Sequence, residues 1–165
     1  MVLPRNPHEV VAEFLALIGL EAHSQLKVSV NESQRGQVSA TSLIQFPSER
    51  PISAYELFAY WLNLSEAPSR HFCQILGTYL LKDPSTSTNE ARLMKAEKLI
   101  HFASKTADGK SEYFSYSVRE KRSCLELFKD FEITNQIPLE YLIQGIGRQR
   151  PREFSISSAP RRAEQ

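Results

Sequence analysis

Apolar residues recur every three or four positions along most of the chain, which is the spacing of helices with one buried face. The pattern predicts helices over residues 7–18, 53–61, 68–80, 93–103, 118–131 and 138–143. Residues 153–158 instead alternate in character, with Phe154 and Ile156 on one side, as in an extended strand. We therefore expect a mostly α fold with strand fragments at its margins.

Capping residues support two of these helices. Asn6 is placed to cap the first helix, with Pro7 at its first position and Gly19 as its stop. Ser53 and Glu56 have the spacing of a capping box ahead of an apolar run.

Breaks in the helical pattern predict the connections. Residues 26–30 alternate like a short strand, and residues 31–42 form a polar loop. Residues 82–89 read as a polar connection, and the pair Asp108-Gly109 as a turn. Residues 1–3 are short and apolar, so both ends of the sequence look cut through a sheet.

Composition narrows the possible functions. The chain has 165 residues and a formal net charge of +1, so no overall field directs it to nucleic acid or to a membrane. No apolar run approaches the roughly 18 residues of a membrane span, and no signal peptide is evident at the N-terminus. The two cysteines, Cys73 and Cys124, fall in apolar helical patterns, which favours reduced core thiols of an intracellular protein. The four histidines share no ligand spacing, so we expect no metal site.

The candidate chemistry lies near the C-terminus. Arg152, Phe154 and Ser155 sit at i, i+2 and i+3 of the extended segment. An arginine offers a planar fork of donors to a phosphate, an aromatic ring offers a flat face, and a serine hydroxyl donates or accepts. This combination is suited to binding a flavin nucleotide.

Four blocks along the chain, in this order, resemble the FAD-binding region of NADPH-dependent diflavin oxidoreductases. They are residues 2–20, 60–72, 121–131 and 137–158. The last block, with Arg150-Pro151-Arg152-Glu153-Phe154-Ser155, is the specific part. The likeness is greatest to the branch that serves cytosolic iron–sulfur assembly.

The resemblance implies roles for individual residues. Arg152 would contact the FAD pyrophosphate, Phe154 would lie against the isoalloxazine and ribityl groups, and Ser155 would lie near the flavin N5, with Glu153 between them. Lys121 stands where the family has the first of two paired arginines, and it keeps the charge of that arginine but not its bidentate fork.

The resemblance also implies an organisation. Residues 1–150 would be the helical connecting region, with a barrel-strand remnant at 1–4, and residues 151–165 would be the first FAD-contacting strand of an incomplete FAD-binding β-barrel. The longer family protein is cytoplasmic and passes electrons from NADPH through FAD and FMN to an acceptor such as anamorsin. None of the six glycines follows Ser158, so the glycine-bearing loop that completes the pyrophosphate site is missing. We therefore expect a partial FAD site, and a fragment that is inactive as an enzyme by itself.

Two alternatives stay open. The chain could be a non-catalytic helical interaction module from a truncated gene product. The arginines near the C-terminus could instead form a nucleic-acid patch; they are Arg148, Arg150, Arg152, Arg161 and Arg162. A strand facing a phosphate-bearing cofactor explains them equally well, so we expect neither nucleic acid nor a membrane as a partner.

Overall fold

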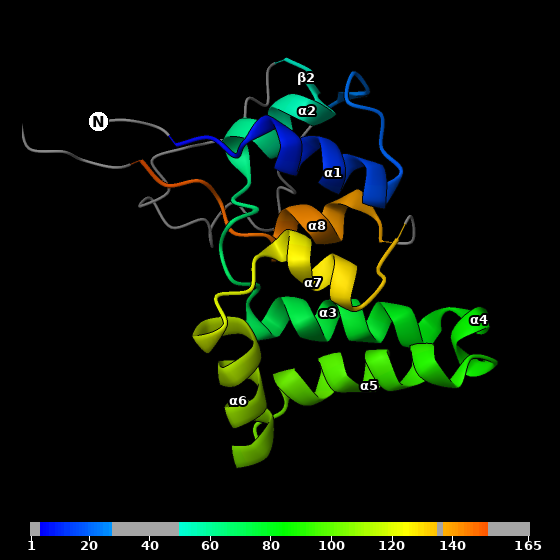
Figure 1. Cartoon of the computed structure of the whole chain (residues 1–165). Helices are drawn as coiled ribbons and strands as arrows, with labels where there is room; N and C mark the ends of the chain where they lie inside the picture. Colours follow the sequence, from blue (N-terminus) through cyan, green and yellow to red (C-terminus); the bar gives the residue numbers. More distant parts are fainter. Residues whose placement is uncertain (1–3, 28–49, 135–136, 152–165) are drawn as a thin grey trace, which may run out of the picture.

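Helices make up most of the computed structural model, which describes residues 4–27, 50–134 and 137–151 (Figure 1). The α-helices are α1 (His8–Ile18), α2 (Ala54–Glu56), α3 (Arg70–Lys82), α4 (Pro84–Ser87), α5 (Glu90–Ala103), α6 (Ala107–Tyr113), α7 (Cys124–Asp130) and α8 (Leu139–Gly145). Two π-helical turns continue α2 and α6: η2 (Leu57–Trp61) and η3 (Phe114–Arg119). The expected mostly α fold is confirmed.

The described strands are one short antiparallel pair. β1 (Gln25–Leu26) pairs with β2 (Ile52–Ser53), with Gln25 opposite Ser53. The strand expected over residues 26–30 is described only at its start, and the loop expected over 31–42 lies outside the described residues. The strand fragments expected at residues 1–3 and 153–158 lie outside them as well.

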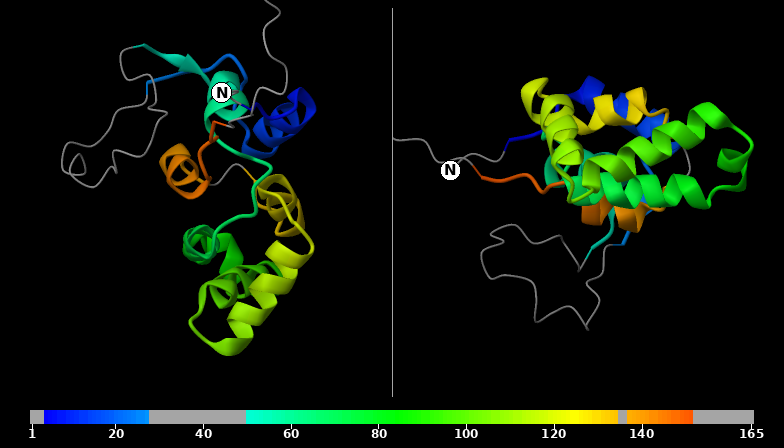
Figure 2. Two further views of the ribbon diagram at one scale, coloured as in Figure 1. Left: turned by 90° about the vertical axis from the view of Figure 1, so that its left-hand side faces the viewer. Right: turned by 90° about the horizontal axis from the view of Figure 1, so that it is seen from below.

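The helices form two groups. Figure 1 shows α3 and α5 as a long hairpin, with α4 at its turn and α6 at its open end, and with α1, α7 and α8 on the α3 side. The left view of Figure 2 shows the chain that follows η2 passing between α7 and α8 before it enters α3. This central segment, residues 61–64, organises the functional site described below.

Aromatic residues join the two groups through the core. The Phe14 ring lies 5.2 Å from that of Phe58 and 4.9 Å from that of Phe128, and the Phe72 and Phe128 rings are 6.3 Å apart. All four side chains are fully buried. Burial of each contributes about 2–3 kcal/mol, so these residues hold α1, η2, α3 and α7 together.

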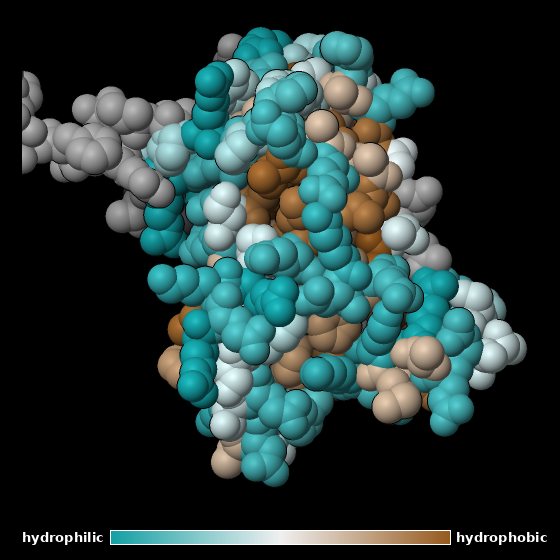
Figure 3. Space-filling view, in the orientation of Figure 1, coloured by the Kyte–Doolittle hydropathy of each residue, from teal (hydrophilic) through white to brown (hydrophobic). Residues whose placement is uncertain are grey.

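One face of the molecule shows how α1 and α7 meet. Figure 3 shows an apolar area over these two helices, bordered by polar atoms. Lys129 Nζ on α7 lies 2.6 Å from Glu13 Oε1 on α1, and both side chains are about half exposed. The apolar contact therefore supplies most of the stabilisation, because an exposed ion pair contributes at most about 1 kcal/mol.

Polar caps begin several of the helices. The side chains of Ser53, Ser69, Asn89, Thr106 and Ser123 each accept a hydrogen bond from a backbone N–H in the following turn. Gly19 ends α1 with φ 64°, and its neighbour Leu20 donates to Leu15 O, so the predicted stop is confirmed. The capping box at Ser53 is only half formed, because Glu56 pairs with Arg50 (2.5 Å). This pairing lowers the pKa of Glu56.

Arg70 fastens the first turn of α3 to the last turn of α5. Its guanidinium donates to Phe102 O (2.9 Å), to Ala103 O (3.1 Å) and to Ser104 O. These carbonyls end a helix and have no partners within it, so a cation there stabilises both helices.

Three sequence predictions about connections were wrong. The Asp108-Gly109 turn is part of α6, because Thr106 caps that helix and accepts from Gly109 N–H (3.1 Å). The helix expected over 118–131 is interrupted at residues 120–123, where Lys121 has φ 54° and Ser123 begins a new helix. The polar connection over 82–89 contains the one-turn helix α4, which Asp83 caps through Ser85 N–H.

The two cysteines are buried and unpaired, as predicted. Desolvation by burial raises the pKa of Cys73 to about 12, and it raises the pKa of Cys124 as well.

Two kinds of feature are missing from the described residues. No helix in this part of the chain is both long and apolar enough to span a membrane. No group of three or more histidine, cysteine, aspartate or glutamate side chains there is arranged to hold a metal ion.

Candidate functional site

The described chain ends at Pro151, directly before the predicted cofactor-binding residues. Arg152, Glu153, Phe154 and Ser155 lie outside the described residues, so their roles stay predictions. The structure does show how the chain is held as it approaches them.

Residues 61–64 are paired on both sides. On one side, Leu62 and Arg148 form an antiparallel bridge, Asn63 N–H donates to Gly147 O (2.7 Å) and Gln149 N–H donates to Trp61 O (2.9 Å). On the other side, Cys124 N–H donates to Leu64 O (3.1 Å). The segment thus connects the approach to residue 152 with the start of α7, three residues after Lys121.

Asn6 is buried at the centre of this arrangement. Its Nδ2 donates to Phe58 O and Leu62 O, each at 2.6 Å. Its Oδ1 accepts from Leu64 N–H (3.3 Å) and from Gln149 Nε2 (3.2 Å). All four hydrogen-bonding positions of the amide are therefore used, as a buried polar side chain requires. We call Asn6, Leu62, Leu64 and Gln149 the Asn6 junction.

The predicted role of Asn6 as a helix cap was wrong. Pro7 occupies the capping position of α1, and no side chain caps that helix. The amide instead satisfies backbone groups of η2 and of the segment after it. Phe58 O lies in the π-helical turn η2, and Leu62 O lies just beyond it. The short Asn6 side chain reaches both carbonyls.

Lys121 occupies the turn between η3 and α7. Its backbone has φ 54°, a left-handed conformation that is uncommon for residues other than glycine. The turn is fixed on both sides, because Arg122 N–H donates to Ser117 O (3.1 Å) and Cys124 N–H donates to Leu64 O. The Lys121 side chain is exposed and forms no ion pair within the described residues.

Arg122, by contrast, is paired with nearby side chains. Its guanidinium lies 3.1 Å from Glu120, 3.5 Å from Asp130 and 5.8 Å from the centre of the Tyr116 ring. The hydrogen bond with Glu120 and the charge of Asp130 raise the pKa of Arg122. Of the adjacent pair, Lys121 is therefore the cation presented to solvent.

The Lys121 turn and the described end of the chain lie on the same side of the molecule. Figure 1 shows both on its left side, and in the left view of Figure 2 that side faces the viewer. Arg150 is exposed on the same approach to residue 152. Exposed cations on this side suit a ligand that carries phosphate groups.

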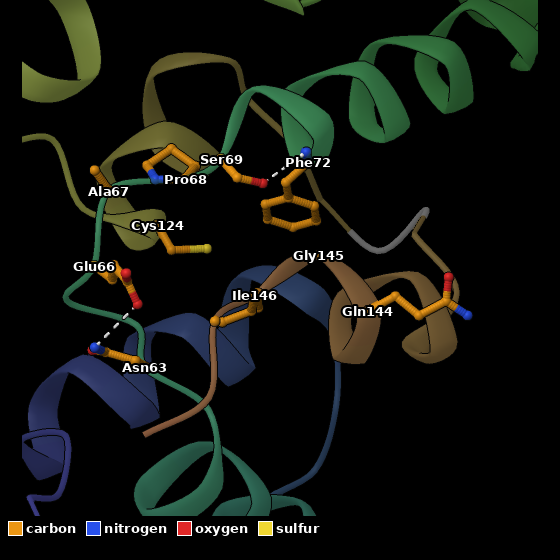
Figure 4. A pocket seen from close by; sticks show the side chains of 11 residues that line it. Asn63, Glu66, Ala67, Pro68, Ser69, Phe72, Cys124, Gln144, Gly145 and Ile146 are labelled. Atoms are coloured by element: carbon orange, nitrogen blue, oxygen red, sulfur yellow. Dashed lines mark hydrogen bonds between the residues drawn. The ribbon is translucent and has the colours of Figure 1, made fainter. Parts of the chain in front are cut away.

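A cavity adjoins this framework but is too small for a dinucleotide. Its volume is about 170 Å³, and Figure 4 shows Phe72, Cys124 and Ile146 around it. A groove of about 280 Å³ lies between α3 and α8, lined by His71, Ile75, Tyr79, Lys82 and Tyr141. Ligand sites usually have about 300–1,000 Å³. Neither hollow is therefore large enough to enclose a dinucleotide.

Gly145 and Gly147 allow the close packing beside this cavity. A Cβ atom on Gly145 would lie 1.9 Å from Phe72 Cδ2, and one on Gly147 would lie 2.6 Å from Glu66 Oε2. Figure 4 shows the Phe72 ring against Gly145. The end of α8 is thus held directly against α3, and the strand-like approach to residue 148 lies against the chain that leads into α3.

Comparison with known protein families identifies the domain. The family described as the FAD binding domain matches this chain over residues 1–165. The chain belongs to the FAD binding domain family.

Three relatives of this FAD-binding chain, from a plant, an amoeba and a mammal, carry the same name. This chain is 31% identical over 160 residues to NADPH-dependent diflavin oxidoreductase 1 of Arabidopsis thaliana, and the match covers 96% of this chain and 23% of the relative. The protein of that name from Dictyostelium discoideum is 30% identical over 158 residues (96% and 22%), and that from Bos taurus is 30% identical over 162 residues (98% and 24%). The chain thus spans less than a quarter of the length of these relatives, and the predicted resemblance is confirmed.

Sequence reasoning missed Gln149 and misassigned Asn6. The two residues are 143 positions apart, and neither lies in an apolar repeat. Gln149 is a polar residue between two arginines in the sequence. In the folded chain it is only 5% exposed. Its burial could not be read from a strongly polar segment.

Proposed function

We propose that this FAD-binding chain comprises two parts of an NADPH-dependent diflavin oxidoreductase. Residues 1–150 would be its helical connecting region, with a barrel-strand remnant at 1–4, and residues 151–165 its first FAD-contacting strand. The observation that carries the proposal is the family match over the whole chain. The mainly helical fold and the common name of the relatives support it.

Each proposed contact has a chemical reason. Arg152 would bind the pyrophosphate through two parallel N–H donors, and Lys121 would add a second positive charge from the η3–α7 turn. Phe154 would stack on the isoalloxazine, and the Ser155 hydroxyl would hydrogen-bond near N5. Glu153 lies between Arg152 and Phe154 in the sequence and would contact the same cofactor. When bound, FAD supplies the hydride and electron chemistry, and the chain binds and orients it.

The activity of the longer protein is part of the same proposal. Electrons would pass from NADPH through FAD and FMN to an acceptor protein, which we propose to be anamorsin in cytosolic iron–sulfur cluster assembly. A protein that contains this chain together with FMN and NADPH domains is expected to be yellow and to reduce ferricyanide with NADPH. A colourless preparation that does not consume NADPH would contradict this part.

Titration of FAD tests the site itself. We expect the 165-residue chain to bind FAD, measured as quenching and increased anisotropy of flavin fluorescence. The Arg152→Gln variant should bind at least about tenfold more weakly, because hydrogen bonds to charged groups contribute about 1.5–3 kcal/mol. The Lys121→Gln variant should bind severalfold more weakly, with the difference shrinking at high salt.

Lys82→Gln is the matched control, since Lys82 is an exposed residue at the far end of α3. Wild-type affinity is expected for this variant. Absence of FAD binding by the wild-type chain at micromolar concentrations would instead favour a non-catalytic helical interaction module. Equal affinities of the Arg152→Gln and wild-type chains would reject the proposed pyrophosphate contact.

A further inference from the structure

The Asn6 junction fixes the chain just before the proposed FAD-contacting strand. We propose that Gln149 is a positioning residue for that strand and that, through Asn6, it sets the affinity of the chain for FAD. This inference rests on the proposed FAD-binding function and adds to it a residue that does not touch the cofactor.

Gln149 is held at two points. Its backbone N–H donates to Trp61 O (2.9 Å), and its side-chain Nε2 donates to Asn6 Oδ1 (3.2 Å). The residue is 5% exposed, whereas its neighbour Arg150 is exposed. A buried donor satisfied by a buried acceptor fixes the position of the chain, since a shift of register would leave the Gln149 donor without its partner.

Asn6 connects Gln149 to η2 and to the segment after it. The same Oδ1 atom accepts from Leu64 N–H, while Nδ2 donates to two carbonyls at η2 and just after it. Leu64 O in turn accepts from Cys124 N–H, three residues after Lys121. The buried amide of Asn6 therefore links Gln149, which precedes the proposed pyrophosphate contact by three residues, to the start of α7, which follows Lys121 by three residues.

Placement of this kind matters for a bidentate ligand. A guanidinium fork bonds two phosphate oxygens only when its position is held within about 0.5 Å. Arg152 follows Gln149 by three residues in the sequence, and Gln149 is the last buried residue of the described chain before it. The chemistry that Gln149 serves is recognition of a dinucleotide pyrophosphate.

The Gln149→Met variant tests the inference. Methionine keeps the length of the side chain and removes its donor, while Asn6 Oδ1 retains Leu64 N–H. We expect the dissociation constant for FAD to rise about fivefold to tenfold, as loss of one buried hydrogen bond predicts. Amide hydrogen exchange in residues 146–151 should become faster, and exchange in α3 and α5 should stay unchanged.

Gln144→Met is the control, because Gln144 is exposed on α8 only five positions upstream. Wild-type affinity and wild-type exchange are expected for it. Unchanged FAD affinity in Gln149→Met would overturn the inference, as would equal acceleration of exchange in α3 and α5, which indicates general destabilisation.

The two proposals fail in different ways. If the wild-type chain binds no FAD, the proposed function fails for this polypeptide, and hydrogen exchange alone decides the positioning role. Acceleration confined to residues 146–151 would then support it, and unchanged exchange there would refute it.

Discussion

Individual buried contacts determine how the segments of this chain meet. Asn6 shows this for polar groups, since one amide supplies two donors and two acceptor positions to backbone and side-chain partners from three parts of the sequence. Gly145 shows it for packing, because the Phe72 ring occupies the space where any other side chain would begin. In both cases the identity of the residue follows from its neighbours in space.

Substitution of Gly145 is expected to destabilise the fold. The Cβ atom of Gly145→Ala would lie 1.9 Å from Phe72 Cδ2, so the fully buried Phe72 ring would have to shift. Such overpacking costs about 1–3 kcal/mol, more than alanine gains over glycine in helix propensity near the end of α8. We expect the thermal midpoint to fall by about 2–4 °C per kcal/mol.

Gly147→Ala is the informative comparison for this prediction. Its Cβ atom meets the carboxylate end of Glu66, which is exposed and can turn into solvent. A change within about 0.5 kcal/mol is therefore expected. Equal midpoints for the two variants in a thermal melt would show that the Phe72 contact is not tight in solution.

At the scale of helices, the turn between η3 and α7 is the best-defined boundary. Ser123 Oγ accepts from Glu126 N–H (3.3 Å), and the Glu126 carboxylate accepts from Ser123 N–H (2.7 Å), which completes a capping box. The hydrogen bond from Ser123 N–H is the main cause of the lowered pKa of Glu126. This box holds the end of the Lys121 turn at the start of α7.

Removal of the cap should destabilise the chain in a pH-dependent way. We expect Ser123→Ala to cost about 1 kcal/mol in urea unfolding at neutral pH. Because the pKa of Glu126 is lower in the folded state, its contribution is present above the ordinary glutamate pKa and is lost as pH falls through the folded value. Ser123→Ala keeps the backbone N–H bond to this carboxylate and removes the hydroxyl bond (2.8 Å), so the part of the difference that comes from the hydroxyl should shrink in acid.

Ser111→Ala, at an exposed position of α6, provides the reference for this measurement. Its free energy of unfolding should match that of the wild type at every pH. A pH-independent deficit in Ser123→Ala would show that the hydrogen bond from Ser123 Oγ to the Glu126 carboxylate adds nothing to the cap.

Sequence patterns predicted the helices better than their connections. The apolar spacing of residues 93–103, the stop at Gly19 and the cap at Ser53 act within one or two turns, so they are visible in the sequence. Gly109 reads as a turn residue locally, yet it is needed because a Cβ there would lie 2.1 Å from Ser104 Oγ. The role of Asn6 was not visible for the same reason: its partners are 52 to 143 residues away, beyond the reach of a local pattern.

At the scale of the whole molecule, both cysteine thiols lie in the interior. Cys73 is fully buried and Cys124 is 2% exposed, and burial raises the pKa of both thiols. With the pKa of Cys73 at about 12, roughly one thiol in 10⁵ is ionised at neutral pH, and only the thiolate reacts.

Thiol labelling should therefore report global unfolding. We expect neither cysteine to react with Ellman's reagent in the native chain, and both to react when urea unfolds it. The Cys73→Ala variant assigns the remaining signal to Cys124. Rapid labelling of one thiol without denaturant would mean that its part of the core opens locally.

The contact between Asn6 and Gln149 also has a consequence for biosynthesis. Its two residues are separated by 143 positions, so at ribosomal speeds of about 5–20 residues per second Gln149 is added roughly 7–30 s after Asn6. During that interval the amide that organises η2 has no C-terminal partner, and the last stretch of backbone that pairs with residues 61–63 does not yet exist. The helical hairpin of α3 and α5 can form early, whereas the Asn6 junction is completed only when the final part of the described chain leaves the ribosome.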